Sequence, residues 1–205
     1  MGLGEDRRAK EYFTFITIFT AALGSFLALI AIIFIRPIGA LLGAEGEMLE
    51  YAVRYGRVVL LGMPFFMLQN SFQNFFITAE RPKLGLGVTV LAGVTNMVLD
   101  ALFIAVFKWA IEGAAAATAL SEFVGGMLPV IYFASKNTSR LGFVRTPAYW
   151  KTLLAVCFNG CSELMSNISS SIVTIFYNYQ LIRFAGEDGV AAYGAIMYVS
   201  FIFVA

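Results

Sequence analysis

The most constraining feature of the sequence is a long apolar run, Leu84–Phe107, that contains a single charged residue, Asp100. The run has 24 residues, and about 20 residues of helix cross the hydrocarbon core of a membrane. Asn96 precedes Asp100 by four residues, so the two side chains share one face of a helix. A charge at that depth costs about 2.5–3.5 kcal/mol on insertion scales, so such a carboxyl is usually protonated, paired or in contact with water. The sequence therefore predicts a membrane helix with one polar face.

The rest of the chain has the composition of a membrane protein. Of its 205 residues 60% are apolar and 13% are charged, whereas a soluble domain has about 25% charged residues. Six apolar runs stand out: Tyr12–Ile35, Val58–Ala79, Leu84–Phe107, Gly113–Ala134, Thr152–Ile182 and Gly189–Ala205. Each of the first five can cross a bilayer as a helix, and the sixth stops after 17 residues, as though cut short. We therefore predict an all-α, polytopic helical membrane protein, with no signal peptide in the charged segment Met1–Glu11.

The lysines and arginines between the runs predict the orientation of the chain. Nine lie on one side: Arg7, Arg8, Lys10, Arg81, Lys83, Lys136, Arg140, Arg145 and Lys151. Five lie on the other: Arg36, Arg54, Arg57, Lys108 and Arg183. The positive-inside rule then places residues 1–11, 80–83 and 135–151 in the cytoplasm. Segment 135–151 is the longest polar connection on that side, and we expect it to separate two helical units, 1–134 and 152–205.

A continuous polar stripe follows one face of the fifth run. It recurs at intervals of three and four residues and consists of Asn159, Glu163, Ser166, Asn167, Ser170, Thr174 and Asn178. A stripe this long indicates a helix that lines a water-filled cavity, with packing against polar groups of other helices as the alternative. In the second run Gln69 and Gln73 lie among phenylalanines and a methionine, a surface that suits apolar ligands and equally suits helix packing. We take these two glutamines and the stripe as candidates for a substrate cavity.

Asp100 and Thr118 are predicted to lie at a similar depth on adjacent helices, roughly 8–10 Å inside one membrane boundary. Asn96, Asp100 and Thr118 could therefore converge on a proton or on one small cation such as Na⁺. The chain has no His, and Cys157 and Cys161 have no further partners, so an imidazole or thiolate metal site is not expected.

Two further carboxyl groups are candidates. Glu163 lies near mid-depth in the fifth run. It is either a functional carboxyl or a protonated carboxyl with a structural role. Glu122 follows Thr118 by four residues on the same face and is an additional candidate.

In series, these motifs resemble the multidrug and toxic compound extrusion (MATE) family of secondary antiporters. The matching segments are Arg81-Pro82-Lys83, Asn96 with Asp100, Gly113 to Thr118, and the stretches NGCSELMSNISSSI and FAGEDGVAAYGAIMYVSFI. The last two are similar to the start of the second lobe in the bacterial multidrug-efflux branch. The resemblance implies two six-helix lobes around a central cavity. This chain would hold about the third to the eighth of twelve helices, with 135–151 as the linker between lobes.

The resemblance also implies roles for single residues. Asn96, Asp100 and Thr118 match a cation or proton site in the N-terminal lobe, and Glu163 is the candidate for an acidic coupling residue on the seventh helix. Glu122 stands where the family pattern has Gln. The expected function is a cation-coupled (H⁺ or Na⁺) antiporter that exports amphipathic organic cations across the plasma membrane by alternating access. It would need no cofactor beyond the coupling ion and would work as a monomer when complete.

Three alternatives remain beside this function. A flippase for a lipid-linked precursor, in the same superfamily, would need basic residues for phosphates, and the six runs contain no Lys or Arg. A membrane-embedded enzyme is disfavoured because the chain has no His and no evident nucleophile–base pair. The third alternative is a shortened chain that cannot transport by itself. A net charge of +1 gives no reason to expect a nucleic-acid partner.

Overall fold

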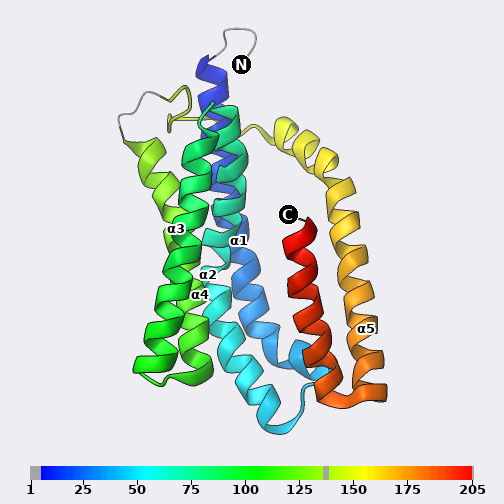
Figure 1. Cartoon of the computed structure of the whole chain (residues 1–205). Coiled ribbons are helices and arrows are strands. Elements are labelled where there is room, and N and C mark those ends of the chain that lie inside the picture. The colour runs from blue at the N-terminus through cyan, green and yellow to red at the C-terminus, as the bar shows by residue number, and fades with distance from the viewer. Residues whose placement is uncertain (1–5, 136–138, 205) are drawn as a thin grey trace. The chain divides into compact units, whose positions relative to one another are not determined.

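The computed structural model describes residues 6–135 and 139–204, and within them the regular structure is helical. Figure 1 shows the elements, which are α1 (Asp6–Leu41), α2 (Gly46–Thr78), α3 (Pro82–Asp100), the π-helical segment η1 (Ala101–Val106), α4 (Ala110–Ala134) and α5 (Trp150–Val204). The all-α fold expected from the sequence is confirmed for these residues. Residues 1–5 and Lys136, both used to predict the orientation, lie outside the described residues.

In the part of the chain that the structure describes, each of the six apolar runs lies almost entirely in helix. The fifth run and the described residues of the sixth lie within α5, which is interrupted at Gly186 by a non-helical backbone conformation (φ 64°, ψ −160°). A residue with a side chain rarely adopts such a positive φ, so the glycine separates two helical stretches. The third run differs most from expectation, because its α-helix gives way to a π-helix directly after Asp100.

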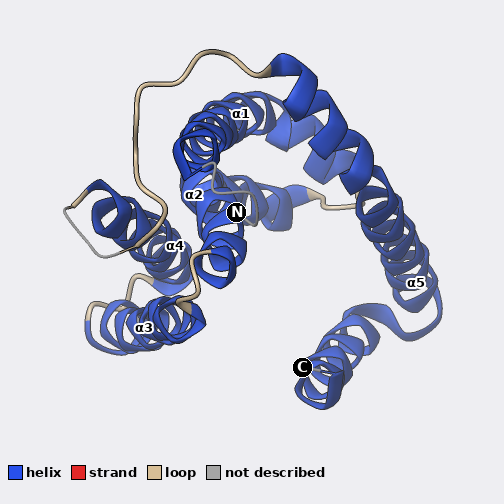
Figure 2. Cartoon of the chain, turned by 90° about the horizontal axis from the view of Figure 1, so that it is seen from above, coloured by secondary structure: helices blue, strands red, loops and turns tan. Residues whose placement is uncertain are grey.

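The chain divides into two compact units, residues 1–149 and 150–205. In the first unit α2 is central, because it packs against α1 on one side and α4 on the other. α3 packs chiefly against α4, and the view from above in Figure 2 shows the same order. The second unit consists of α5 alone. The assignment of 1–134 and 152–205 to two transporter lobes, with 135–151 as linker, stays a prediction.

Three helical segments in the described part of the chain are long and apolar enough to cross a membrane: α1, Pro82–Val106 and α4. The sequence predicts that α2 and α5 cross as well, although neither is among these three segments. The physical reason is local, because α2 carries the amides around Gln69 and Gln73 and α5 carries the polar stripe. A helix whose polar side chains face other helices or water does not need a uniformly apolar surface.

Glycines allow α2 to approach both of its neighbours closely. A Cβ atom at Gly24 of α1 would lie 2.9 Å from Pro64 Cα, and one at Gly126 of α4 would lie 2.5 Å from the Phe65 carbonyl oxygen. Ala115 and Ala117 of α4 are fully buried. Small residues at contacts are expected where membrane helices associate, because lipid supplies no hydrophobic force between helices. The α1–α2–α4 layer is therefore held by close packing.

An aromatic core joins α1, α2 and α4 near one end of the first unit. The ring of Phe13 lies 5.0 Å from Phe133 and 6.1 Å from Phe72, measured between centroids. Leu141 packs into the same core from the segment that follows α4. This apolar packing fixes one end of the bundle, and polar residues occupy positions farther along α2, α3 and α4.

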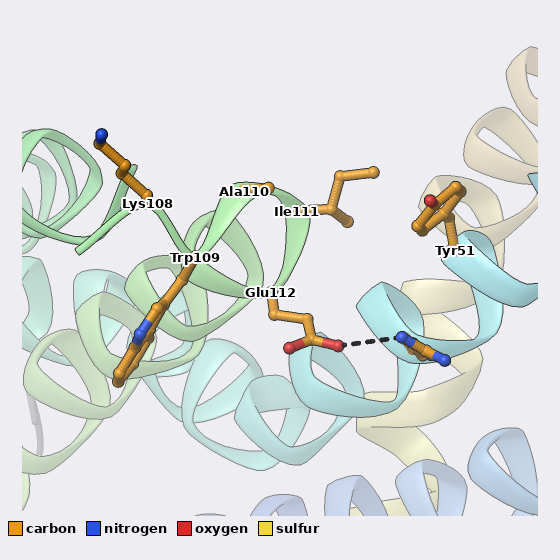
Figure 3. A pocket seen from close by; sticks show the side chains of 7 residues that line it. Tyr51, Lys108, Trp109, Ala110, Ile111 and Glu112 are labelled. Carbon is orange, nitrogen blue, oxygen red and sulfur yellow. Dashed lines mark ion pairs between the residues drawn. The ribbon is translucent and has the colours of Figure 1, made fainter. Parts of the chain in front are cut away.

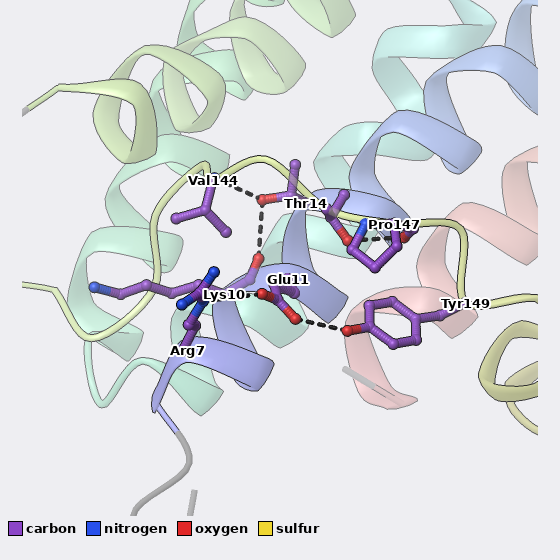
Figure 4. A network of polar contacts seen from close by, with 8 residues as sticks. Arg7, Lys10, Glu11, Thr14, Val144, Pro147 and Tyr149 are labelled. Carbon is purple, nitrogen blue, oxygen red and sulfur yellow. Dashed lines mark hydrogen bonds and ion pairs between the residues drawn. The ribbon is translucent and has the colours of Figure 1, made fainter.

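The segment that follows α4 is also attached to α1 by polar contacts, shown in Figure 4. The hydroxyl of Tyr149 donates a hydrogen bond to Glu11 Oε2 at 2.6 Å, and Arg7 pairs with the same carboxylate at 3.2 Å. The backbone N–H of Val144 donates to Thr14 Oγ1 at 3.1 Å. Because the Glu11 carboxylate accepts this bond from the neutral phenol, the pKa of Tyr149 is raised.

Candidate functional site

A pocket of about 350 Å³ lies between α2, α3 and α4, and we call it the three-helix pocket. Its lining combines apolar and polar side chains: Phe66, Gln69, Thr89, Ala92, Gly93, Asn96, Thr118, Ser121 and Glu122. Its volume is at the lower end of the range for small-molecule sites, about 300–1,000 Å³. The structure therefore brings four candidates from the sequence to one place, namely Gln69, Asn96, Thr118 and Glu122.

The spacing of residues on each helix explains the lining. On α3, Thr89, Gly93 and Asn96 follow one another at intervals of four and three, so they share one face of the helix. On α4, Thr118 is followed by Glu122 one turn later. Sequence reasoning missed Thr89, although it lies seven residues before Asn96, a helical interval that could have identified it.

Asp100 lies one helical turn beyond Asn96, at the last residue of α3. It is partly buried, and its Oδ1 is buried with no hydrogen-bond partner in the described part of the chain. Asp100 is not among the residues that line the three-helix pocket, and the Thr118 hydroxyl donates to Ala114 O within α4 at 3.0 Å. The convergence of Asn96, Asp100 and Thr118 on one ion therefore stays a prediction.

The backbone changes character immediately after Asp100. In η1 the N–H of Phe107 donates to Leu102 O at 3.0 Å, a bond across five residues instead of four. Single π-helical turns occur frequently at functional sites, where the wider turn changes the direction of the side chains. The predicted coupling carboxyl thus lies at a junction between two helix types.

Glu122 is partly buried at the contact between α4 and α2. Its Oε2 is buried and, among the described residues, has no hydrogen-bond partner. The oxygen occupies the space beside Gly62, since a Cβ added at that glycine would collide with it. An unsatisfied polar atom of this kind costs about 1–3 kcal/mol, and more for a charged group. Glu122 is therefore a carboxyl that a donor or a cation would stabilise.

The two glutamines of α2 differ in their surroundings. Gln69 lines the three-helix pocket and lies against α4, where a Cβ at Gly125 would be 2.5 Å from Gln69 Cδ. Gln73 donates from Nε2 to Thr89 Oγ1 at 3.2 Å and so links α2 to α3. Its predicted contribution to a substrate cavity is not tested by this contact.

The polar stripe lies along α5, in the second unit. Asn167 donates from Nδ2 to the backbone oxygen of Glu163 at 2.8 Å and approaches its Oε1 at 3.4 Å. Thr174 donates to Ser170 O at 2.9 Å. These bonds stay within the helix, and Glu163 is exposed. The predicted cavity role of Asn159, Ser166, Asn167, Ser170, Thr174 and Asn178 and the coupling role of Glu163 remain predictions.

A second pocket, of about 660 Å³, lies where the α3–α4 turn meets α2 (Figure 3). It is lined by Tyr51, Arg54, Lys108, Trp109, Ala110, Ile111 and Glu112, none of which the sequence singled out for binding. Arg54 and Glu112 form an exposed ion pair at 3.6 Å. Aromatic rings beside cations are typical of membrane–water interfaces, which agrees with the outer position predicted for this turn.

Comparison with curated proteins gives consistent relatives. The model of the MatE family matches residues 1–102, about half of the chain. The chain is 30% identical over 176 residues to the Multidrug export protein MepA of Staphylococcus saprophyticus, covering 84% of this chain and 38% of that protein. It is 29% identical over 175 residues to MepA of Staphylococcus aureus strain bovine RF122, with the same coverage of 84% and 38%. The chain thus spans less than half the length of these relatives.

Two solved structures share the fold. One is described as the inward-facing conformation of a multidrug resistance MATE family transporter of the MOP superfamily. The match has a TM-score of 0.85 and 25% sequence identity, and it covers 98% of this chain and 46% of the chain of that transporter. The other, a MATE in the bent conformation, has a TM-score of 0.77 and 25% identity, with coverage of 96% and 45%. The helices that can cross a membrane and the similarity to solved MATE transporters together define a multi-pass plasma-membrane protein with a transporter fold. The chain belongs to the MATE family, which confirms the resemblance read from its motifs.

Proposed function

We propose that the protein containing this chain is a cation-coupled antiporter, in which inward movement of H⁺ or Na⁺ drives export of amphipathic organic cations by alternating access. The observation that carries the proposal is Asp100, whose Oδ1 is buried without a partner in the described chain. Asp100 also lies one turn from Asn96, which lines the three-helix pocket. A carboxyl in an apolar helix is stabilised by a proton or a cation, and this dependence can couple ion binding to conformation.

The energetic requirement for coupling is modest. The ion must bind more tightly in one arrangement of the protein than in the other, because equal affinity shifts no equilibrium. A difference of one pKa unit at a coupling carboxyl between two states is worth about 1.4 kcal/mol. Asn96 and Thr118 would supply neutral oxygens beside the carboxylate, and Glu163 would respond separately in the second unit.

The lining of the three-helix pocket bears on the alternatives. It includes hydroxyl, amide and carboxyl groups but no Lys or Arg among the described lining residues. Such a pocket suits a cation better than the phosphates of a lipid-linked precursor. The relatives bear the name multidrug export protein, which supports drug-like substrates and a transport role without catalysis. We propose that the complete protein acts as a monomer.

The test uses the complete protein, purified and placed in liposomes. Accumulation of the fluorescent cation ethidium is followed under an imposed pH gradient and, as the paired condition, under a Na⁺ gradient. Uphill movement driven by one ion and lost in Asp100→Asn is the expected result. Glu112→Gln is the matched control, because Glu112 is exposed and paired with Arg54. Uphill transport that survives in a folded Asp100→Asn, Glu163→Gln double variant would contradict the proposal.

A further inference from the structure

Glu122 is a carboxyl group in the lining of a pocket, and no neighbouring group among the described residues neutralises its charge. It lines the three-helix pocket, its Oε2 is buried without a hydrogen-bond partner, and no Lys or Arg pairs with it in the described chain. The cations of α2, Arg54 and Arg57, are exposed, and Arg54 already pairs with Glu112. A positive charge inside the pocket would therefore meet a carboxylate that no other group neutralises.

The packing of α2 against α4 fixes the position of this carboxylate. Gly62 supplies the space for Oε2, and a Cβ there would also lie 3.1 Å from Ala119 Cα, so the two helix backbones are close at this level. Because one carboxylate oxygen lies in the contact between helices, the group cannot turn freely into solvent. Its charge is held at the wall of the pocket before any ligand arrives, which lowers the entropic cost of binding.

The size and lining of the pocket identify the kind of cation. A volume of about 350 Å³ is far larger than a bare Na⁺ ion requires and falls in the range of small-molecule sites. Phe66, Ala92 and Gly93 supply apolar contacts, while Gln69, Thr89 and Ser121 supply polar atoms. This combination of a counter-ion, an aromatic ring and a few polar groups suits a substituted ammonium group, which an aromatic face also attracts.

We propose that Glu122 is the counter-ion for the positively charged headgroup of an organic cation bound in the three-helix pocket. This inference rests on the proposed function and names the subsite that holds the charge of the substrate. It also separates two roles, because Asp100 lies outside the pocket lining and Glu122 lies within it. The coupling ion and the substrate headgroup then have different carboxylates.

The test compares a cation with its uncharged isostere on the complete purified protein. Titration calorimetry without any gradient measures binding of benzyltrimethylammonium and of neopentylbenzene, in which carbon replaces the charged nitrogen. The wild type should prefer the cation, and Glu122→Gln should weaken cation binding by about tenfold or more while leaving isostere binding unchanged. Glu112→Gln, on the same helix, should leave both unchanged because its carboxylate lies outside the three-helix pocket.

Gly62→Ala provides a second variant that retains the carboxylate. The added methyl group collides with Glu122 Oε2, so the carboxylate must move, and cation binding should change while binding of the uncharged isostere does not. Equal binding of cation and isostere by the wild type would overturn the inference. Cation binding as tight in folded Glu122→Gln as in the wild type would also overturn it. This holds even if the variant changes how cation binding depends on Na⁺ or H⁺. Selective loss of cation binding in that variant, in a protein whose wild type shows no gradient-driven transport, would support the subsite and refute coupled antiport.

Discussion

Replacing Gly126 with alanine is expected to loosen the contact between α4 and α2. A Cβ at this position would lie 2.5 Å from the Phe65 carbonyl oxygen, 2.8 Å from Phe65 Cα and 2.9 Å from Phe65 Cβ. Two of these atoms belong to the backbone, so the clash cannot be relieved by turning a side chain, and the helices must separate. Overpacking of this kind costs about 1–3 kcal/mol. Alanine regains up to about 1 kcal/mol of helix propensity over glycine, so the expected net loss is about 0–2 kcal/mol relative to the wild type. Relative to a glycine-to-alanine change without a clash, the expected loss is the full cost of about 1–3 kcal/mol.

Gly87 provides the matched control. It also lies inside a helix, α3, but a Cβ there would meet nothing within 4 Å. Gly87→Ala should therefore be neutral or slightly stabilising, because only the helix-propensity gain applies. Denaturant unfolding of the complete protein in detergent, followed by far-ultraviolet circular dichroism, measures both variants. If Gly126→Ala proved at least as stable as Gly87→Ala, the inference of close helix contact would be wrong.

Two further predictions concern the first unit. Phe133→Ala should lower the free energy of unfolding by about 3–5 kcal/mol, because its buried ring lies at the centre of the aromatic core. Ile131→Ala, on an exposed position of the same helix, should cost much less, and equal losses would contradict the assigned core. The raised pKa of Tyr149 predicts that its hydrogen bond to Glu11 is complete at neutral pH. That bond should be lost as the pH rises through the raised pKa. The phenolate absorbance difference between wild type and Tyr149→Phe measures this titration, and a midpoint at or below that of exposed tyrosines would exclude the contact.

The helices could be predicted from the sequence because a membrane allows few alternatives. A run of apolar residues must satisfy its backbone hydrogen bonds internally, so run length translates directly into helix. The interval between Asn96 and Asp100 likewise fixes their common face wherever the helix lies in the protein. The same reasoning placed Thr118 and Glu122 together on one face of α4, and both line the three-helix pocket.

What the sequence did not reveal depends on how helices are rotated and aligned against one another. The contact between Gly62 and Glu122 joins positions 60 residues apart, and no periodicity within either helix specifies it. The hydrogen bond from Gln73 to Thr89 is of the same kind, because its formation depends on the alignment of α2 with α3. The π-helical segment after Asp100 has no compositional signal either, since Ala101–Val106 is an ordinary apolar sequence.

The difference between glutamate and glutamine at position 122 bears on what the three-helix pocket can bind. The resemblance to the family implies Gln there, and a glutamine amide carries its own donors as well as an acceptor. Glutamate has nearly the same shape but, when ionised, can only accept, so its buried Oε2 needs a donor or a positive charge from elsewhere. Among the described residues no donor bonds to this oxygen, and no Lys or Arg lines the pocket. The departure from the family pattern therefore creates a requirement that a bound cation can meet, whereas glutamine at the same position would not.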